Sequence, residues 1–198
     1  MYLIATVPED ITKKLDEIIN KKHTEKANHD LAGNIQNEFL IPEGKPIIWP
    51  LIDKCIQAHF DKFPTYYARI SGMHKSDEFH LELHSLWVNY QKKYEFNPLH
   101  THSGFVSFVI FMSIPYNLQD EEDMFKEANN KQASKFGFFS PDHRHPGGIH
   151  MVSLNVDKSY VGKMIMFKSS QVHGVYPFYT SNDYRITISG NLVFKVTN

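Results

Sequence analysis

Two histidines one residue apart are the most specific chemical feature of the sequence. His100 and His102 lie in the segment Asn97-Pro-Leu-His-Thr-His-Ser-Gly, and a lone histidine, His173, follows much later. Side chains two residues apart in a β-strand point to the same face. A strand here therefore predicts two imidazoles side by side, which is the arrangement that zinc, iron or copper needs. A pair of surface or internally hydrogen-bonded histidines has the same short pattern and remains the alternative.

An arginine and two hydroxyls form a second candidate site near the C-terminus. Arg185, Thr187 and Ser189 alternate with Ile186 and Ile188, so the three polar side chains share one face of a strand. A guanidinium binds a carboxylate through two parallel hydrogen bonds, and hydroxyls add further donors. The pattern predicts a carboxylate-binding face. The solvent-facing side of an edge strand is the alternative.

The composition is that of a soluble globular domain. The chain has 198 residues, a formal net charge of −1, 41% hydrophobic residues and 22% charged residues. This length favours one domain with a sizeable core and excludes a mostly disordered chain. The near-neutral charge argues against an extended nucleic-acid surface. The single cysteine, Cys55, excludes an intramolecular disulfide and a cysteine-rich zinc site.

Neither a leader nor a membrane segment is expected from the sequence. The first 22 residues lack a basic segment followed by an apolar one. The longest apolar run, residues 105–115, is too short to cross a bilayer. We therefore expect a cytoplasmic protein with no membrane partner.

The first third of the chain predicts helices. Ile11, Leu15, Ile18 and Ile19 have helical spacing. Residues 30–39 suggest a second, short helix, residues 42–50 a proline-rich connection, and residues 51–63 a third helix that stops at a proline.

From about residue 66 the pattern changes to short β-branched and aromatic runs. These predict an all-β barrel or sandwich. The expected strands are residues 81–91, 99–102, 105–114, 149–156, 163–168, 172–178 and 185–196. Residues 117–148 interrupt them as a long connection, with an acidic start, room for a short helix up to residue 135, and a Pro/Gly-rich end. We expect this connection to be mobile or to form a lid.

Taken together, these motifs resemble the Fe(II)- and 2-oxoglutarate-dependent oxygenases. The similarity rests on the His-x-His segment, on His173 after its turn, and on the Arg-x-Thr-x-Ser strand. Within the family, the chain looks most like small oxygenases of marine phages and bacteria. Residues 107–111 and 31–35 are also similar to that group, and the resemblance covers about residues 80–194.

The resemblance implies a mainly β fold, a double-stranded β-helix or jelly roll, carrying Fe(II). One domain would span residues 1–198, with a helical layer at 1–65 and the jelly roll at 66–198. His173 would be the distal metal ligand and His100 the proximal one. Arg185 would bind the distal carboxylate of 2-oxoglutarate with help from Thr187 or Ser189.

The implied activity is that of a dioxygenase, a hydroxylase above all, which uses Fe(II), 2-oxoglutarate and O₂. The implied partner is therefore a small-molecule cosubstrate. Asn89, on the strand before the histidines, could hydrogen-bond that cosubstrate or the substrate. The primary substrate is unknown and could be a peptide, a nucleobase or a metabolite. A homodimer is left open, and a phage protein would act in the host cytoplasm.

The sequence departs from the common family pattern at one position. The usual facial triad has two histidines and one carboxylate, but His102 stands where the carboxylate is expected. In the preferred account, His100, His102 and His173 form a three-histidine centre. In a second account, His102 is the proximal ligand and Gly104 occupies the acid position, which leaves a coordination position open, as in halogenating members. In the third account, the site is no longer catalytic.

Two rival functions remain open. A cupin-type three-histidine metalloprotein shares the histidines but gives no role to Arg185. A catalytically silent binding or virion-associated β-domain needs no metal.

Overall fold

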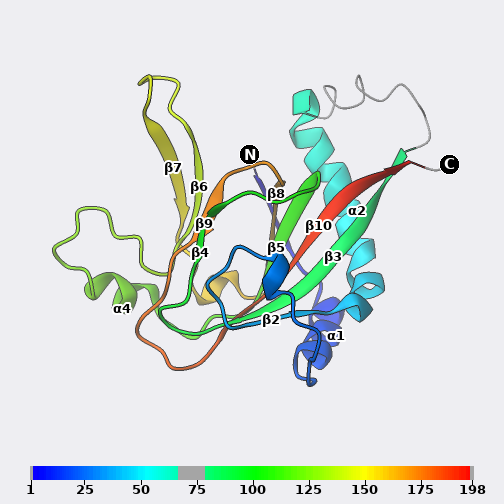
Figure 1. The fold of residues 1–198 in the computed structure, drawn as a ribbon, viewed down its shortest axis with the longest axis horizontal. Coiled ribbons are helices and arrows are strands. Elements are labelled where there is room, and N and C mark those ends of the chain that lie inside the picture. Colours follow the sequence, from blue (N-terminus) through cyan, green and yellow to red (C-terminus); the bar gives the residue numbers. More distant parts are fainter. Residues whose placement is uncertain (1, 67–78, 197–198) are drawn as a thin grey trace.

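The structure is a computed structural model that describes residues 2–66 and 79–196. Two antiparallel sheets form its centre (Figure 1). The large sheet has the order β1-β8-β5-β10-β3-β2, and the small sheet has the order β4-β9-β6-β7. The strands are β1 (Tyr2–Thr6), β2 (Asn37–Leu40), β3 (Phe79–Gln91), β4 (Asn97–His100), β5 (Val106–Ser113), β6 (Phe136–Pro141), β7 (Ile149–Leu154), β8 (Lys163–Lys168), β9 (His173–Val175) and β10 (Arg185–Val196). The predicted mainly β architecture is confirmed.

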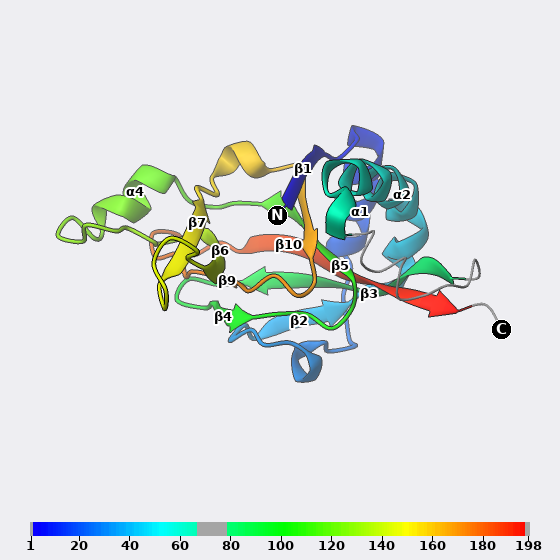
Figure 2. The ribbon, with the colours of Figure 1, turned by 90° about the horizontal axis from the view of Figure 1, so that it is seen from above.

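Two helices cover the outer face of the large sheet. α1 (Glu9–Ile19) and α2 (Lys45–Lys62) lie side by side there (Figure 2). The predicted stripe of α1 is confirmed, because Ile11, Leu15, Ile18 and Ile19 are all buried. Their burial joins the helices to the sheet in one hydrophobic cluster. No helix within residues 2–66 and 79–196 is long and apolar enough to cross a membrane.

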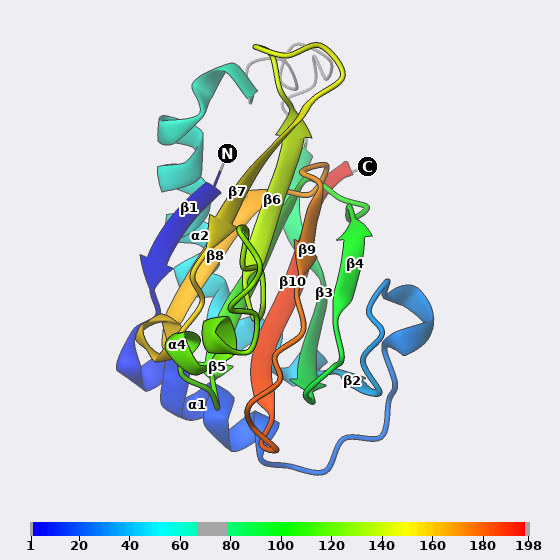
Figure 3. The same cartoon turned by 90° about the vertical axis from the view of Figure 1, so that its left-hand side faces the viewer.

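A second, aromatic cluster fills the space between the two sheets. Phe111 and Phe167 from the large sheet meet Phe136 and Phe138 from the small sheet. The rings of Phe138 and Phe167 lie 5.2 Å apart in an edge-to-face arrangement, which is a favoured geometry for aromatic pairs. This packing holds β6 and β9 of the small sheet against β8. Figure 3 shows the two sheets from the side.

The N-terminal segment contributes strands as well as helices, which the sequence analysis missed. The helix expected at residues 30–39 is wrong: a 3₁₀ turn at Asn28–Asp30 is followed by strand β2. β2 pairs with β3, so its backbone hydrogen bonds are made across the sheet instead of along a helix. The boundary at residue 65 therefore does not divide helices from strands, since β1 and β2 both join the large sheet.

α2 begins earlier than expected. Residues 45–50 are helical, although their prolines suggested a connection. Pro46 lies in the first turn, where the missing N–H has no intrahelical partner to lose.

The long connection expected at residues 117–148 is partly wrong. The short helix expected in its first part is present as α4 (Leu118–Asp123), but the segment also contains the central strand β6, which pairs with both β7 and β9. Its Phe-Gly-Phe-Phe run does not alternate apolar and polar residues, and its pairing partners lie later in the sequence. The strand was therefore not expected. Glu121 ties α4 down by accepting hydrogen bonds from the backbone N–H groups of Tyr179 and Thr180. The parts that remain for a lid are those before Phe136 and the turn at residues 142–148 between β6 and β7.

The pH dependence of the stability should depend on a buried histidine of helix α2, outside the candidate metal site. His59 of α2 is fully buried. Burial, and secondarily the Lys62 and Lys168 cations, lower its pKa to about 4. Since the unfolded chain protonates near pH 6.5, stability is complete above that pH and falls as the pH drops toward 4. We expect a loss of about 3 kcal/mol from this group.

Chemical denaturation at pH 7 and at pH 4.5 measures this effect. His59→Met should reduce the pH dependence by about this amount, whereas His29→Gln, at an exposed histidine, should not change it. An unchanged slope in His59→Met would contradict the assignment.

Candidate active site

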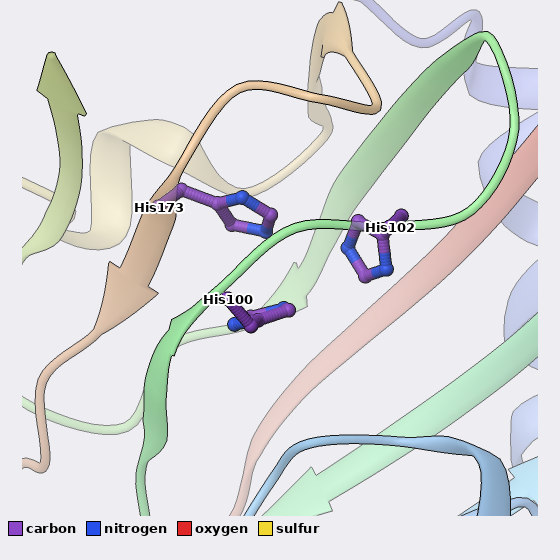
Figure 4. A group of neighbouring side chains, drawn as sticks. All are labelled: His100, His102 and His173. Carbon is purple, nitrogen blue, oxygen red and sulfur yellow. The ribbon is translucent and has the colours of Figure 1, made fainter.

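Three histidine side chains converge between β4 and β9 (Figure 4). His100 and His173 are directly paired across the two strands. Their ring centroids are 4.2 Å apart, and the ring of His102 lies 4.9 Å from His100 and 5.0 Å from His173. One nitrogen from each ring lies within 4.8 Å of the other two. The structure thus brings together all three residues that the sequence analysis named as metal ligands.

His100 and His102 lie side by side, but not because they share one face of a single strand, as the sequence predicted. The strand expected at residues 99–102 spans Asn97–His100, and His102 lies beyond its end. The backbone N–H of His102 donates to the carbonyl of Ser169 (2.9 Å). This contact with the segment before β9 holds the second imidazole beside the first.

Hydrogen bonds to the backbone fix the tautomers of two of the imidazoles. Nδ1 of His100 lies 2.7 Å from the carbonyl oxygen of Pro98, and Nδ1 of His173 lies 2.9 Å from that of Gln171. A carbonyl oxygen only accepts, so each Nδ1 carries the hydrogen. Nε2 of each ring is then the free ligand atom, as is common for metal-bound histidines.

The environment also keeps the three imidazoles unprotonated. Burial is the main cause of the lowered pKa values, which are about 4 for His102 and about 3 for His173. Burial lowers the pKa of His100 as well. Mutual repulsion of the three rings adds to the effect. Neutral imidazoles with free Nε2 atoms are the form that binds a metal, so the residues present fit a divalent ion.

The cavity beside the histidines has a volume of about 50 Å³ and polar groups on its large-sheet wall. Asn89, Thr187, Ser189 and Arg185 all line it, as expected from their strand faces. The amide Nδ2 of Asn89 donates to the hydroxyl of Thr187 at 3.0 Å and to that of Ser189 at 3.4 Å. The four candidate cosubstrate-binding residues therefore share one surface with the histidines.

Arg185 is buried and fully hydrogen-bonded by neutral acceptors. Nε and Nη2 both donate to Oε1 of Gln91 (3.1 and 2.8 Å). Nη1 donates to the Tyr116 hydroxyl (2.9 Å) and the Ser134 carbonyl (2.8 Å), and Nη2 also donates to the Tyr176 carbonyl (2.9 Å). All five N–H groups of the guanidinium thus have protein acceptors, and none of these acceptors is charged.

The positive charge of Arg185 nevertheless lacks an acidic partner among the described residues. The other cation buried in that part of the chain, Lys135, forms an ion pair with Glu122 at 2.9 Å. Unpaired buried charge is costly. A bound anion would offset this cost, so the guanidinium remains the group best suited to a carboxylate.

The backbone of Gly104 lies close to the large sheet. Its φ is +123°, and a Cβ built there would lie 2.9 Å from the carbonyl oxygen of Leu192. A side chain at this position would meet the large sheet, away from the three imidazoles.

Replacement of Gly104 should therefore destabilise the protein. We expect Gly104→Ala to lower the free energy of unfolding by about 1–3 kcal/mol, from backbone strain. Gly162→Ala is the matched control, because Gly162 also has a positive φ (+76°) but open space around it. Urea denaturation of the two variants compares them. Equal losses would show that the contact with Leu192 has no effect.

Several residues of the site were not found from the sequence. Glu38 lines the cavity from β2, and Ser134 lines it from the segment before β6. Each belongs to a segment that was assigned as helix or as loop, so its direction could not be derived. A lone acid beside Phe39 was the only available signal for Glu38.

The comparison with protein families decides the assignment. Residues 85–191, more than half of the chain, match the family described as "Putative 2OG-Fe(II) oxygenase". The chain belongs to this 2OG-Fe(II) oxygenase family. The family match extends from β3 to β10 and contains all three histidines and Arg185.

Solved structures similar to this oxygenase confirm the double-stranded β-helix. An oxidoreductase of the 2OG-Fe(II) oxygenase family from Burkholderia pseudomallei matches with a TM-score of 0.54 and 11% identity, over 97% of this chain and 84% of that one. A Pseudomonas putida prolyl-4-hydroxylase matches with 0.52 and 14%, over 96% and 90%. HygX from Streptomyces hygroscopicus, solved with nickel and 2-oxoglutarate bound, matches with 0.50 and 12%, over 99% and 83%.

At these identities the solved structures establish the fold alone. No curated protein matches the oxygenase in sequence. Family membership identifies a metal ion and 2-oxoglutarate as the groups that this fold uses.

Proposed function

We propose that the protein is an Fe(II)- and 2-oxoglutarate-dependent dioxygenase that hydroxylates a primary substrate. The observation that carries the proposal is the cluster of three neutral imidazoles in one cavity with Arg185. A metal site and a cosubstrate-carboxylate site within one cavity suit this chemistry. A cupin-type centre without 2-oxoglutarate would leave the buried positive charge of Arg185 without an anionic partner.

His100, His102 and His173 would hold the iron, the first and last through Nε2. The three-histidine account is supported by the position of the His102 ring beside those of His100 and His173. When bound, the iron and 2-oxoglutarate supply the oxidising chemistry, in which O₂ is reduced and 2-oxoglutarate is converted to succinate and CO₂.

The chain's own residues bind, orient and exclude water. Phe136 stacks on His173 with an interplanar angle of 16°, and the ring centroid of Phe167 lies 4.7 Å from it. These rings keep the metal environment dry and fix the imidazole. Thr187 and Ser189 offer hydroxyls beside the path from the metal to Arg185.

Arg185 would bind the distal carboxylate by exchanging neutral acceptors for an anionic one. Gln91 and Tyr116 contribute side-chain oxygens to the guanidinium, so their replacement would leave the hydrogen bonds from Arg185 to the Ser134 and Tyr176 carbonyls in place. Charge-assisted hydrogen bonds are about twice as strong as neutral ones, which favours the exchange.

We also propose a location and a range of substrate classes. A cytoplasmic location suits the one buried, unpaired cysteine, Cys55. A peptide, a nucleobase or a small metabolite could each serve as substrate.

Anaerobic addition of Fe(II) and then 2-oxoglutarate tests the proposal. A visible charge-transfer band that needs both components, with succinate formed on admission of O₂, is the expected result. Metal binding without a response to 2-oxoglutarate would favour the cupin-type function. Absence of metal binding would favour a silent binding domain.

A further inference from the structure

Glu38 is a buried acid at the edge of the cavity that the proposed reaction does not use. It lies directly opposite Asn89 in the pairing of β2 with β3, and Asn89 lies opposite Thr187 in the pairing of β3 with β10. Paired side chains on one face of a sheet are about 4.5–5.5 Å apart at Cβ. Glu38, Asn89 and Thr187 therefore form one polar row along the cavity wall.

The oxygens of this row are short of hydrogen-bond donors. Glu38 is 1% exposed, yet among the described residues only Nδ2 of Asn28 donates to it, at 3.2 Å to Oε2. No ion pair to Glu38 is formed within residues 2–66 and 79–196. Oδ1 of Asn89, on a side chain 5% exposed, is buried and has no partner. Buried acceptors without donors are costly and indicate a missing partner.

The charge state of Glu38 agrees with a missing cation. Burial, and then the Glu95 carboxylate, raise its pKa to about 7, against the weaker opposing effect of Lys26. Lys26 itself donates to the carbonyl of Gln36 and to Asn37, so it does not pair with the acid. A cation bound in the cavity would favour the ionised carboxylate.

The backbone leaves Glu38 accessible from the cavity. Gly33 lies next to it, and a Cβ at Gly33 would approach Oε1 of Glu38 to 3.0 Å and would clash with Oδ1 of Asn97. A side chain at this position would therefore crowd the carboxyl where it lines the cavity. Arg185 offers donors at one place on the wall, and Glu38 offers acceptors at another. The cavity thus has one subsite for an anion and one for a cation.

We propose that Glu38 is a specificity-determining residue that binds a positively charged nitrogen group of the primary substrate, with Oδ1 of Asn89 accepting a further hydrogen bond from it. This inference rests on the proposed function, which requires a primary substrate besides 2-oxoglutarate. The cationic group must belong to that substrate, since 2-oxoglutarate carries no positively charged nitrogen. An ammonium or a guanidinium has the required chemistry.

Calorimetric titration with matched pairs of ligands tests the inference. The probes are Nα-acetyl-arginine amide against Nα-acetyl-citrulline amide, and Nα-acetyl-lysine amide against Nα-acetyl-norleucine amide. Each pair differs mainly in one positive charge, and the two pairs separate guanidinium from ammonium. The titrations use the full chain both metal-free and loaded anaerobically with Fe(II) and 2-oxoglutarate. We expect at least one cation to bind 10-fold more tightly than its neutral analogue.

The variants assign the preference to Glu38. Glu38→Gln keeps the shape and removes the charge, so the cation preference should fall to about twofold or less. Glu38→Asp keeps the charge and should retain a weakened preference, which covers the case in which the first variant does not fold. Glu17→Gln, at an exposed acid of α1, should behave as the wild type.

Two results would overturn the inference: no cation preference in the wild type, or a preference that survives in folded Glu38→Gln. Failure of the proposed function gives a different result, because the wild type would then bind no metal or no 2-oxoglutarate, whatever its preference for cations. The metal-free titration still reports on Glu38 in that case.

Discussion

Replacement of His173 by alanine should lower the affinity for Fe(II) at least about 100-fold and abolish metal-dependent turnover. Loss of groups that merely orient ligands already costs 10–100-fold, and His173 would supply a ligand atom itself. It is also the most buried of the three histidines, at 3% exposure, so no solvent-held group can readily replace it. Metal content after dialysis, and 2-oxoglutarate turnover, measure the two effects.

The same measurement on neighbouring histidines separates the accounts of the site. His102→Ala should lose metal as His100→Ala does if the centre has three histidines. His150→Ala removes an exposed histidine of β7 and should change nothing. Full metal content in His102→Ala would reject the three-histidine centre, and full content in His173→Ala would reject the metal site altogether.

Arg185→Ala should weaken 2-oxoglutarate binding by about 2–5 kcal/mol, the range for truncating one partner of a buried charge pair. The variant would leave the cosubstrate carboxylate unpaired in the cavity. Metal content should be nearly unchanged, because Arg185 contacts none of the three histidines through a hydrogen bond. Titration of the charge-transfer band with 2-oxoglutarate measures the affinity.

The controls address the role of Arg185 in the fold. Its side chain holds Gln91, Tyr116 and two backbone carbonyls, so Arg185→Ala should also be less stable, and thermal unfolding must accompany the titration. Arg185→Lys keeps the charge but loses the two-pronged geometry and should fall between wild type and alanine. Arg144→Ala, at an exposed arginine, should bind normally. If folded Arg185→Ala bound 2-oxoglutarate with wild-type affinity, a cupin-type centre would be favoured.

Local patterns were sufficient for much of the fold. The predicted strands at 163–168 and 185–196 agree at both ends with β8 and β10, and the stripe of α1 is buried as expected. β8 is a short apolar run between two lysines, buried on both faces, and in β10 and α1 the apolar residues recur with the period of the element. In each case the information lies within the segment. The face that carries Arg185, Thr187 and Ser189 followed from the same alternation.

The candidate ligands could also be named from the sequence, because a short His-x-His motif and a later histidine carry that chemistry in their residue types. Their convergence could not be derived. His102 lies outside β4 and is placed by the carbonyl of Ser169, a residue distant in sequence. The division into one domain over residues 1–198 likewise remains a prediction.

The tertiary structure decided the elements whose pairing partners are far away along the chain. β2 has only four residues and a sequence compatible with a helix, and it becomes a strand because β3 satisfies its backbone. β6 is central because β7 and β9 close on it from both sides. Whether such a segment becomes a strand depends on contacts with residues far away in the sequence, which a local sequence pattern does not include. For that reason Glu38, and with it the acidic part of the cavity wall, became visible only when β2 was placed beside Asn89.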